Sequence, residues 1–164
     1  MGIQLPGELV SLLQILGYNF PKGDEQKLFE MGQTWLNFGN KLKEVSQNGQ
    51  KVASQVWEQN KGANIDAFQK HYEADDGPTK VLDGISTGGQ VVGAGMMICA
   101  GIILALKIST ITQLVTLAIE IAQAIASAVA TFGASLAEIP IFEQISQRIV
   151  GELIQQVINK LMEA

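Results

Sequence analysis

Residues 24–57 read DEQKLFEMGQTWLNFGNKLKEVSQNGQKVASQVW, and this stretch decides the fold. Its apolar residues recur in alternating steps of three and four, apart from a gap around Gly49: Leu28, Met31, Trp35, Phe38, Leu42, Val45, Val52 and Val56. This heptad spacing predicts a long helix whose apolar seam packs against a neighbour. Asp24 is suited to cap its start by accepting a free backbone N–H of the first turn. A glycine costs a helix about 1 kcal/mol relative to alanine, which allows a break at Asn48 and Gly49.

Further helices are expected along the rest of the chain. A turn at residues 60–62 precedes a short amphipathic helix that carries Ile65, Phe68 and Tyr72 on one face. The sequence Asp-Asp-Gly-Pro at residues 75–78 ends that helix, because glycine and proline together punctuate a chain. Beyond it, helical spacing predicts an apolar helix up to Leu106.

The last part of the sequence continues the helical pattern. A second buried helix is expected over residues 108–132, with Gly133 as its C-cap. Pro140 precedes a final amphipathic helix. No segment has the alternating pattern of a strand, so the fold class expected is an all-α, elongated helical bundle.

The distribution of charge leaves two interpretations open. Of the 164 residues 47% are hydrophobic and 16% charged, against about 25% charged in an average soluble domain. Two thirds of the charged residues lie in residues 1–80, whereas residues 91–106 are all apolar or glycine. A transmembrane helix needs roughly 20 mostly apolar residues, so this run is borderline. Small residues at helical spacing suit close helix packing in water or in lipid alike.

Residues that could carry chemistry are scarce. One cysteine and one histidine are too few for a disulfide framework or a zinc site, and a net charge of −5 argues against a nucleic-acid partner. His71 is interpreted as a surface residue and Cys99 as a small buried hydrophobic residue. The acids around Asp75 lack the spacing of a calcium-binding loop. We therefore expect no catalytic residue, no metal site and no cofactor.

The N-terminal stretch resembles a known family. Gly-Tyr-Asn-Phe-Pro-Lys-Gly-Asp at residues 17–24 is followed by Leu28 and then by a tryptophan on the predicted long helix. This order is similar to the opening of the WXG-like N-terminal domains of actinobacterial polymorphic toxins. The motif residues carried over are Phe20, Pro21, Gly23, Asp24 and Trp35. The resemblance implies a helical module exported by a type VII (ESX-type) secretion system.

Two more features of that family can be placed on this sequence. Gly62, Phe68 and Tyr72 keep the spacing of the glycine and the two aromatic residues of the WXG hairpin signature, whereas Trp57 lies five residues before the glycine and not two. The bend is therefore expected to be stretched or displaced. The type VII export signal Tyr-x-x-x-Asp/Glu, which follows the second helix of a hairpin, is matched by Tyr72 and Asp76.

The sequence therefore predicts a single helical domain over residues 1–164. It consists of an N-terminal segment (1–22), a hairpin (23–76) and apolar helices (78–164). The function expected is non-catalytic: a secretion-targeting and scaffold domain of a type VII-exported effector or toxin, secreted or on the cell surface. Its expected partners are the secretion machinery and either a small WXG-type protein or a second copy. The alternative is a membrane-inserting or pore-forming helical protein, although a charge such as Glu120 in a membrane helix costs roughly 2.5–3.5 kcal/mol.

Overall fold

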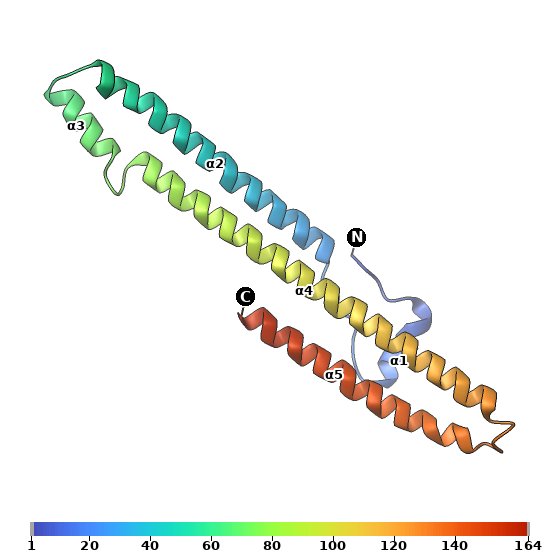
Figure 1. Ribbon diagram of the computed structural model, residues 1–164. Helices are drawn as coiled ribbons and strands as arrows, with labels where there is room; N and C mark the ends of the chain where they lie inside the picture. The colour runs from blue at the N-terminus through green and yellow to red at the C-terminus, as the bar shows by residue number, and fades with distance from the viewer. Residues whose placement is uncertain (1, 164) are drawn as a thin grey trace. The chain divides into compact units, whose positions relative to one another are not determined.

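The computed structural model describes residues 2–163, and every regular element among them is helical. In chain order the elements are α1 (Gly7–Ile15), α2 (Glu25–Gln59), α3 (Ala63–Tyr72), α4 (Pro78–Ser127), the 3-10 helix η1 (Ala134–Glu138) and α5 (Ile139–Glu163) (Figure 1). The all-α fold class is confirmed.

The chain divides into two compact units. Unit 1 contains residues 2–27 and 98–163, and unit 2 contains residues 28–97. Helices α2 and α4 each have residues in both units, because each continues without interruption across the division.

Local signals set most helix ends as expected. Asp24 Oδ1 accepts a 3.1 Å hydrogen bond from the backbone N–H of Lys27, and α2 begins at Glu25, directly after Asp24. The expected turn at residues 60–62 separates α2 from α3, with Gly62 at φ 135°. Helix α4 begins with Pro78. Proline has no backbone N–H, which costs nothing at this position because the N–H would have no partner within the helix.

Two expected interruptions are absent. Helix α2 runs through Gly49, so the break that this residue allowed does not form. The apolar segments before and after Lys107 belong to one helix, α4, and not to a pair of helices. Gly133 adopts the expected left-handed conformation at φ 86°, but α4 ends earlier, at Ser127, and a series of turns connects the two.

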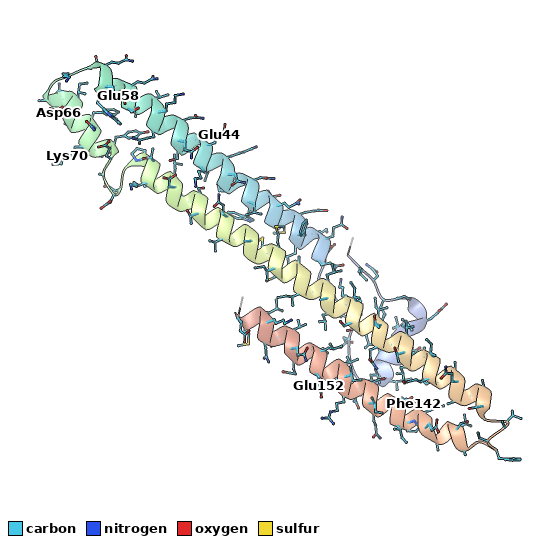
Figure 2. The ribbon with its side chains drawn as sticks, in the orientation of Figure 1. Glu44, Glu58, Asp66, Lys70, Phe142 and Glu152 are labelled. Atoms are coloured by element: carbon cyan, nitrogen blue, oxygen red, sulfur yellow. The ribbon has the colours of Figure 1, made fainter. Side chains whose placement is uncertain are left out.

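Unit 1 has the more usual apolar core. Buried leucines of α1 and the residue after it pack against α4 and α5, and the cluster comprises Leu9, Leu13, Leu16, Leu114, Leu117 and Val150. Phe142 of α5, labelled in Figure 2, packs against this cluster from the edge.

Unit 2 is held together by small residues. Its buried residues on α2 recur every seven positions, at Gly32, Gly39, Ser46 and Ala53. They face the first part of α4, which runs antiparallel to α2 in Figure 1. A Cβ atom on Gly39 would lie 2.7 Å from the carbonyl oxygen of Ser86, and Ser86 Oγ donates a 2.7 Å hydrogen bond to the carbonyl of Gly39. The two backbones therefore approach too closely for larger side chains at this level.

This packing corrects the expected heptad seam. Most of its large residues are exposed, including Trp35 at 40% and Phe38 at 44%. The seam that α4 covers is shifted by one residue, from Met31 and Phe38 to Gly32 and Gly39. The large apolar residues thus form a separate stripe on α2, defined by Met31, Trp35, Phe38, Val45, Val52 and Val56 and here called the α2 stripe.

Candidate recognition site at the α2–α3 bend

The residues predicted to mark the hairpin meet at one aromatic cluster in unit 2. Trp57 lies in the last turn of α2, and Phe68 and Tyr72 lie one turn apart on α3. Ring centroids are separated by 5.8 Å for Trp57–Phe68, 5.9 Å for Trp57–Tyr72 and 5.7 Å for Phe68–Tyr72. Tilted aromatic rings at these distances attract one another beyond the area that they bury. The cluster therefore holds α3 against the end of α2.

The bend between these helices consists of two polar residues, Asn60 and Lys61, followed by Gly62. The side-chain amide of Asn60 donates a 2.8 Å hydrogen bond to the carbonyl of Val56, which closes the last turn of α2. Gly62 has a positive φ that non-glycine residues rarely adopt. Because the bend turns the chain back, Trp57 at the end of α2 reaches the aromatic residues of α3 although it lies five residues before the glycine.

Tyr72 is the last residue of α3 and is half-buried. Its ring packs on the cluster, and its hydroxyl lies against Gly49 of α2, where a Cβ atom would be only 3.1 Å away. Gly49 therefore has a packing role that its place in the sequence did not reveal. The Tyr72 side chain as a whole remains partly exposed at the end of the helix.

A tight turn connects Tyr72 to α4 and carries Asp76. The N–H of Gly77 donates a 2.8 Å hydrogen bond to the carbonyl of Ala74, and a Cβ atom on Gly77 would clash with the carbonyl oxygen of Tyr72. Asp76 itself is exposed. The charged residues labelled on α2 and α3 in Figure 2, namely Glu44, Glu58, Asp66 and Lys70, are also exposed.

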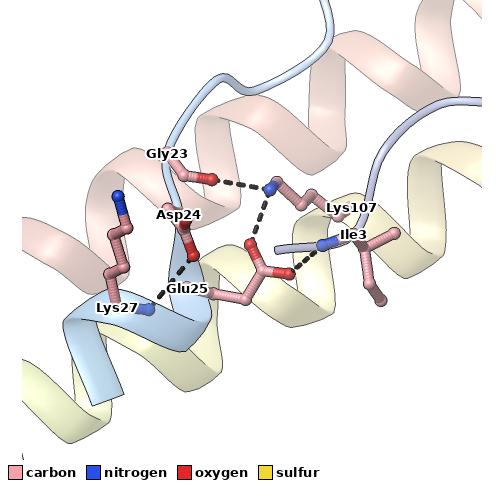
Figure 3. A network of polar contacts seen from close by, with 6 residues as sticks. All are labelled: Ile3, Gly23, Asp24, Glu25, Lys27 and Lys107. Carbon is pink, nitrogen blue, oxygen red and sulfur yellow. Dashed lines mark hydrogen bonds and ion pairs between the residues drawn. The ribbon is translucent and has the colours of Figure 1, made fainter. Parts of the chain in front are cut away.

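Four of the five N-terminal motif residues lie in unit 1, around or next to a buried ion pair (Figure 3). Lys107 Nζ lies 2.5 Å from Glu25 Oε2 and donates a 2.6 Å hydrogen bond to the carbonyl of Gly23. The same carboxylate accepts the backbone N–H of Ile3, and the ring of Phe20 lies 5.8 Å from Lys107 Nζ. Pro21 belongs to the same connecting segment. This motif therefore fixes the chain ahead of α2.

Two neighbouring acids at the start of α2, Asp24 of the motif and Glu25, both have lowered pKa values. The side-chain hydrogen bond from Lys107 lowers the pKa of Glu25 from 4.5 to about 2, against the opposing effect of burial. The backbone N–H of Lys27 lowers the pKa of Asp24. Glu25 was not predicted as a functional or structural residue. One feature of the sequence could have indicated a buried partner for Lys107: it is the lone charged residue between Asp83 and Glu120.

Trp35, the remaining motif residue, lies on the α2 stripe of unit 2. Its ring meets Phe38 edge to face at 5.8 Å with an interplanar angle of 89°. Both side chains remain partly exposed on the surface of unit 2. Within residues 2–163, no group of three or more His, Cys, Asp or Glu side chains could hold a metal ion.

Comparison with known families decides the relationship. A family model described as a WXG100-like domain matches residues 4–149. The chain belongs to the WXG100-like domain family. This WXG100-like domain is thereby related to type VII secretion, the route by which proteins of the family are exported. No curated protein and no solved structure matches it.

Proposed function

We propose that this WXG100-like domain is a non-catalytic targeting and scaffold module of an effector or toxin exported by a type VII system. Tyr72 and Asp76 form its recognition signal. The observation that carries the proposal is the position of Tyr72, which ends α3 at the aromatic cluster and is followed by the tight turn that exposes Asp76.

The aromatic cluster gives the signal a defined geometry. Tyr72 is held by two neighbouring rings, and Gly77 constrains the turn that carries Asp76. A side chain that is already ordered loses less conformational entropy when a receptor binds it. A receptor would then contact the accessible part of the tyrosine and pair a cationic group with the carboxylate.

The scaffold role rests on the α2 stripe. Large apolar residues that lie together on a surface mark interaction sites more often than isolated ones do. Trp35 and Phe38 supply the aromatic centre expected of an interface. In this proposal a small WXG-type partner or a second copy covers the stripe, and the complex is the exported species.

Export of tagged variants from a host with a type VII system tests the signal. We expect Tyr72→Ala and Asp76→Asn to remain in the cell fraction while the wild type reaches the medium. Asp75→Asn is the matched control for the second change, since it removes an adjacent exposed acid without altering the Tyr-x-x-x-Asp spacing.

A second control separates recognition from folding. Phe68→Ala removes a ring of the same cluster but leaves both signal residues in place. If Phe68→Ala is exported and Tyr72→Ala is retained, with equal helical circular dichroism, the tyrosine acts as a signal. Normal export of Tyr72→Ala would refute the targeting role.

Membrane insertion or pore formation is the second candidate, and one observation favours it. Helix α4 is long and apolar enough to cross a membrane, judged by length and composition alone. Its most apolar 18-residue window has a mean hydropathy of 2.3, and 17% of that window is buried. The core helix of a water-soluble protein would be mostly buried. Release of a dye trapped in liposomes would support this candidate over the scaffold role.

A further inference from the structure

The connection between α4 and α5 in unit 1 is an apolar tip. No charged residue occurs between Glu120 and Glu138, a span that contains the end of α4 and most of η1. At the apex Val129 is 89% exposed and Phe132 is 100% exposed. Further exposed large apolar residues flank them at Ile125, Leu136 and Ile141. We call residues 125–137 the α4–α5 tip, and Ile141 lies just beyond it on α5.

The backbone at the apex is unfavourable for the residue that it carries. Phe132 has a φ of 51°, in the left-handed region that bulky residues rarely adopt. Asparagine or glycine would adopt this conformation at lower cost. The fold thus holds an aromatic ring outward at a position where a small residue would be more stable, and such outliers concentrate at binding sites.

The hydroxyl groups of the tip form hydrogen bonds within the segment. The hydroxyls of Ser127, Thr131 and Ser135 donate hydrogen bonds to carbonyls of Gln123, Ser127 and Ala124 at 2.9, 3.0 and 2.7 Å. Backbone N–H groups do the same: Gly133 donates to Ala128 at 2.7 Å and Ala134 donates to Thr131 at 3.1 Å. A polar group that enters the hydrocarbon of a bilayer has no water to bond with, so it must form its hydrogen bonds within the protein, as these groups do.

We propose that the α4–α5 tip inserts shallowly into one leaflet of a lipid bilayer and docks this domain on membranes. A protein partner would ordinarily form about one hydrogen bond per 100–200 Å² of interface, and the tip hydroxyls are already engaged within the chain. The charged residues that border the tip are acids, Glu120, Glu138 and Glu143. The lipid surface expected is therefore zwitterionic, because an anionic one would repel these carboxylates.

Flotation with phosphatidylcholine vesicles tests the proposal. We expect the wild type to float with the vesicles, with little dependence on salt because apolar contact and not charge drives binding. Phe132→Asn should lower the vesicle partition coefficient about tenfold, since the exposed aromatic surface is lost. Phe132→Leu should retain binding. Phe29→Asn is the control, because it makes the same change at a phenylalanine on α2 of unit 2 that is also exposed, at 41%.

The asparagine variant also controls for folding. Asparagine tolerates positive φ, so the melting temperature of Phe132→Asn should equal or exceed that of the wild type. Val129→Asn provides a second, independent loss of apolar surface. Failure of the wild type to float, or equal flotation of Phe132→Asn, would overturn the proposal.

Two other results would replace it. Release of an encapsulated dye by the wild type would indicate a membrane-spanning state and not shallow docking. Absence of flotation, together with an oligomer that Phe132→Asn dissociates, would assign the tip to a second copy of the chain. Docking of the tip on membranes does not depend on the export signal. Loss of flotation and loss of Tyr72-dependent export are therefore separate outcomes.

Discussion

Lys107 and Glu25 form a buried ion pair, with Nζ 2.5 Å from Oε2 and side-chain exposures of 3% and 8%. Each charged group also has a hydrogen bond outside the pair. The carboxylate also accepts the N–H of Ile3, and the ammonium also donates to the carbonyl of Gly23. The pair therefore fastens the N-terminal segment and the start of α2 to α4 within unit 1.

Removal of the lysine alone is expected to destabilise the domain strongly. Lys107→Met leaves the Glu25 carboxylate buried without its counter-charge, which typically costs about 3–5 kcal/mol of unfolding free energy. Chemical denaturation followed by circular dichroism measures the change. Arg148→Met is the control, because the Arg148–Glu152 pair is exposed and such pairs contribute about 0–1 kcal/mol. Equal effects of the two variants would contradict a structural role for the buried pair.

The same pair predicts a pH dependence of stability. Glu25 has a pKa of about 2 in the folded chain, below its ordinary value of 4.5, so the folded state binds the proton less readily than the unfolded state. The stabilisation from Glu25 is therefore fully present above pH 4.5 and is lost as pH falls from 4.5 towards 2. Denaturation midpoints across this range should show the decline. In Glu25→Gln the decline should be smaller.

Close packing in unit 2 predicts opposite effects for two glycine-to-alanine changes. A Cβ atom on Gly39 would lie 2.7 Å from the carbonyl oxygen of Ser86, a backbone atom that cannot rotate away. Gly39→Ala should cost about 1–3 kcal/mol of unfolding free energy through overpacking. Gly84→Ala is the control on α4, where nothing lies within 4 Å of the new Cβ. It should stabilise by up to about 1 kcal/mol through helix propensity, as measured by thermal denaturation.

The turn after Tyr72 predicts a link between local packing and export. Gly77→Ala would place a Cβ against the carbonyl oxygens of Tyr72 and Ala74, so the turn must open. We expect a loss of stability of about 1–3 kcal/mol and reduced export, because Asp76 moves relative to Tyr72. Gly95→Ala, with open space around its Cβ, should leave export unchanged. Full export of a demonstrably altered Gly77→Ala would show that the spacing of the two residues is not read.

Local chemistry made much of the fold predictable. The Asp24 cap, the bend at residues 60–62 and the break before Pro78 depend on residues within a few positions of each other, and each appears in the structure. The aromatic cluster was partly predictable for the same reason, since Phe68 and Tyr72 lie one helical turn apart. Trp57 joins them because a short bend brings the end of α2 back against α3.

The sequence by itself determined that this chain is helical, where α2, α3 and α4 begin, and that large apolar residues follow a heptad on α2. Only the tertiary structure decided which face of that heptad is buried. Backbones can approach closely only where both carry small residues, so α4 packs on Gly32, Gly39 and Ser46, and the larger side chains of the α2 stripe stay outside. Lys107 likewise found its partner, Glu25, 82 residues away, a distance in sequence that no local pattern spans.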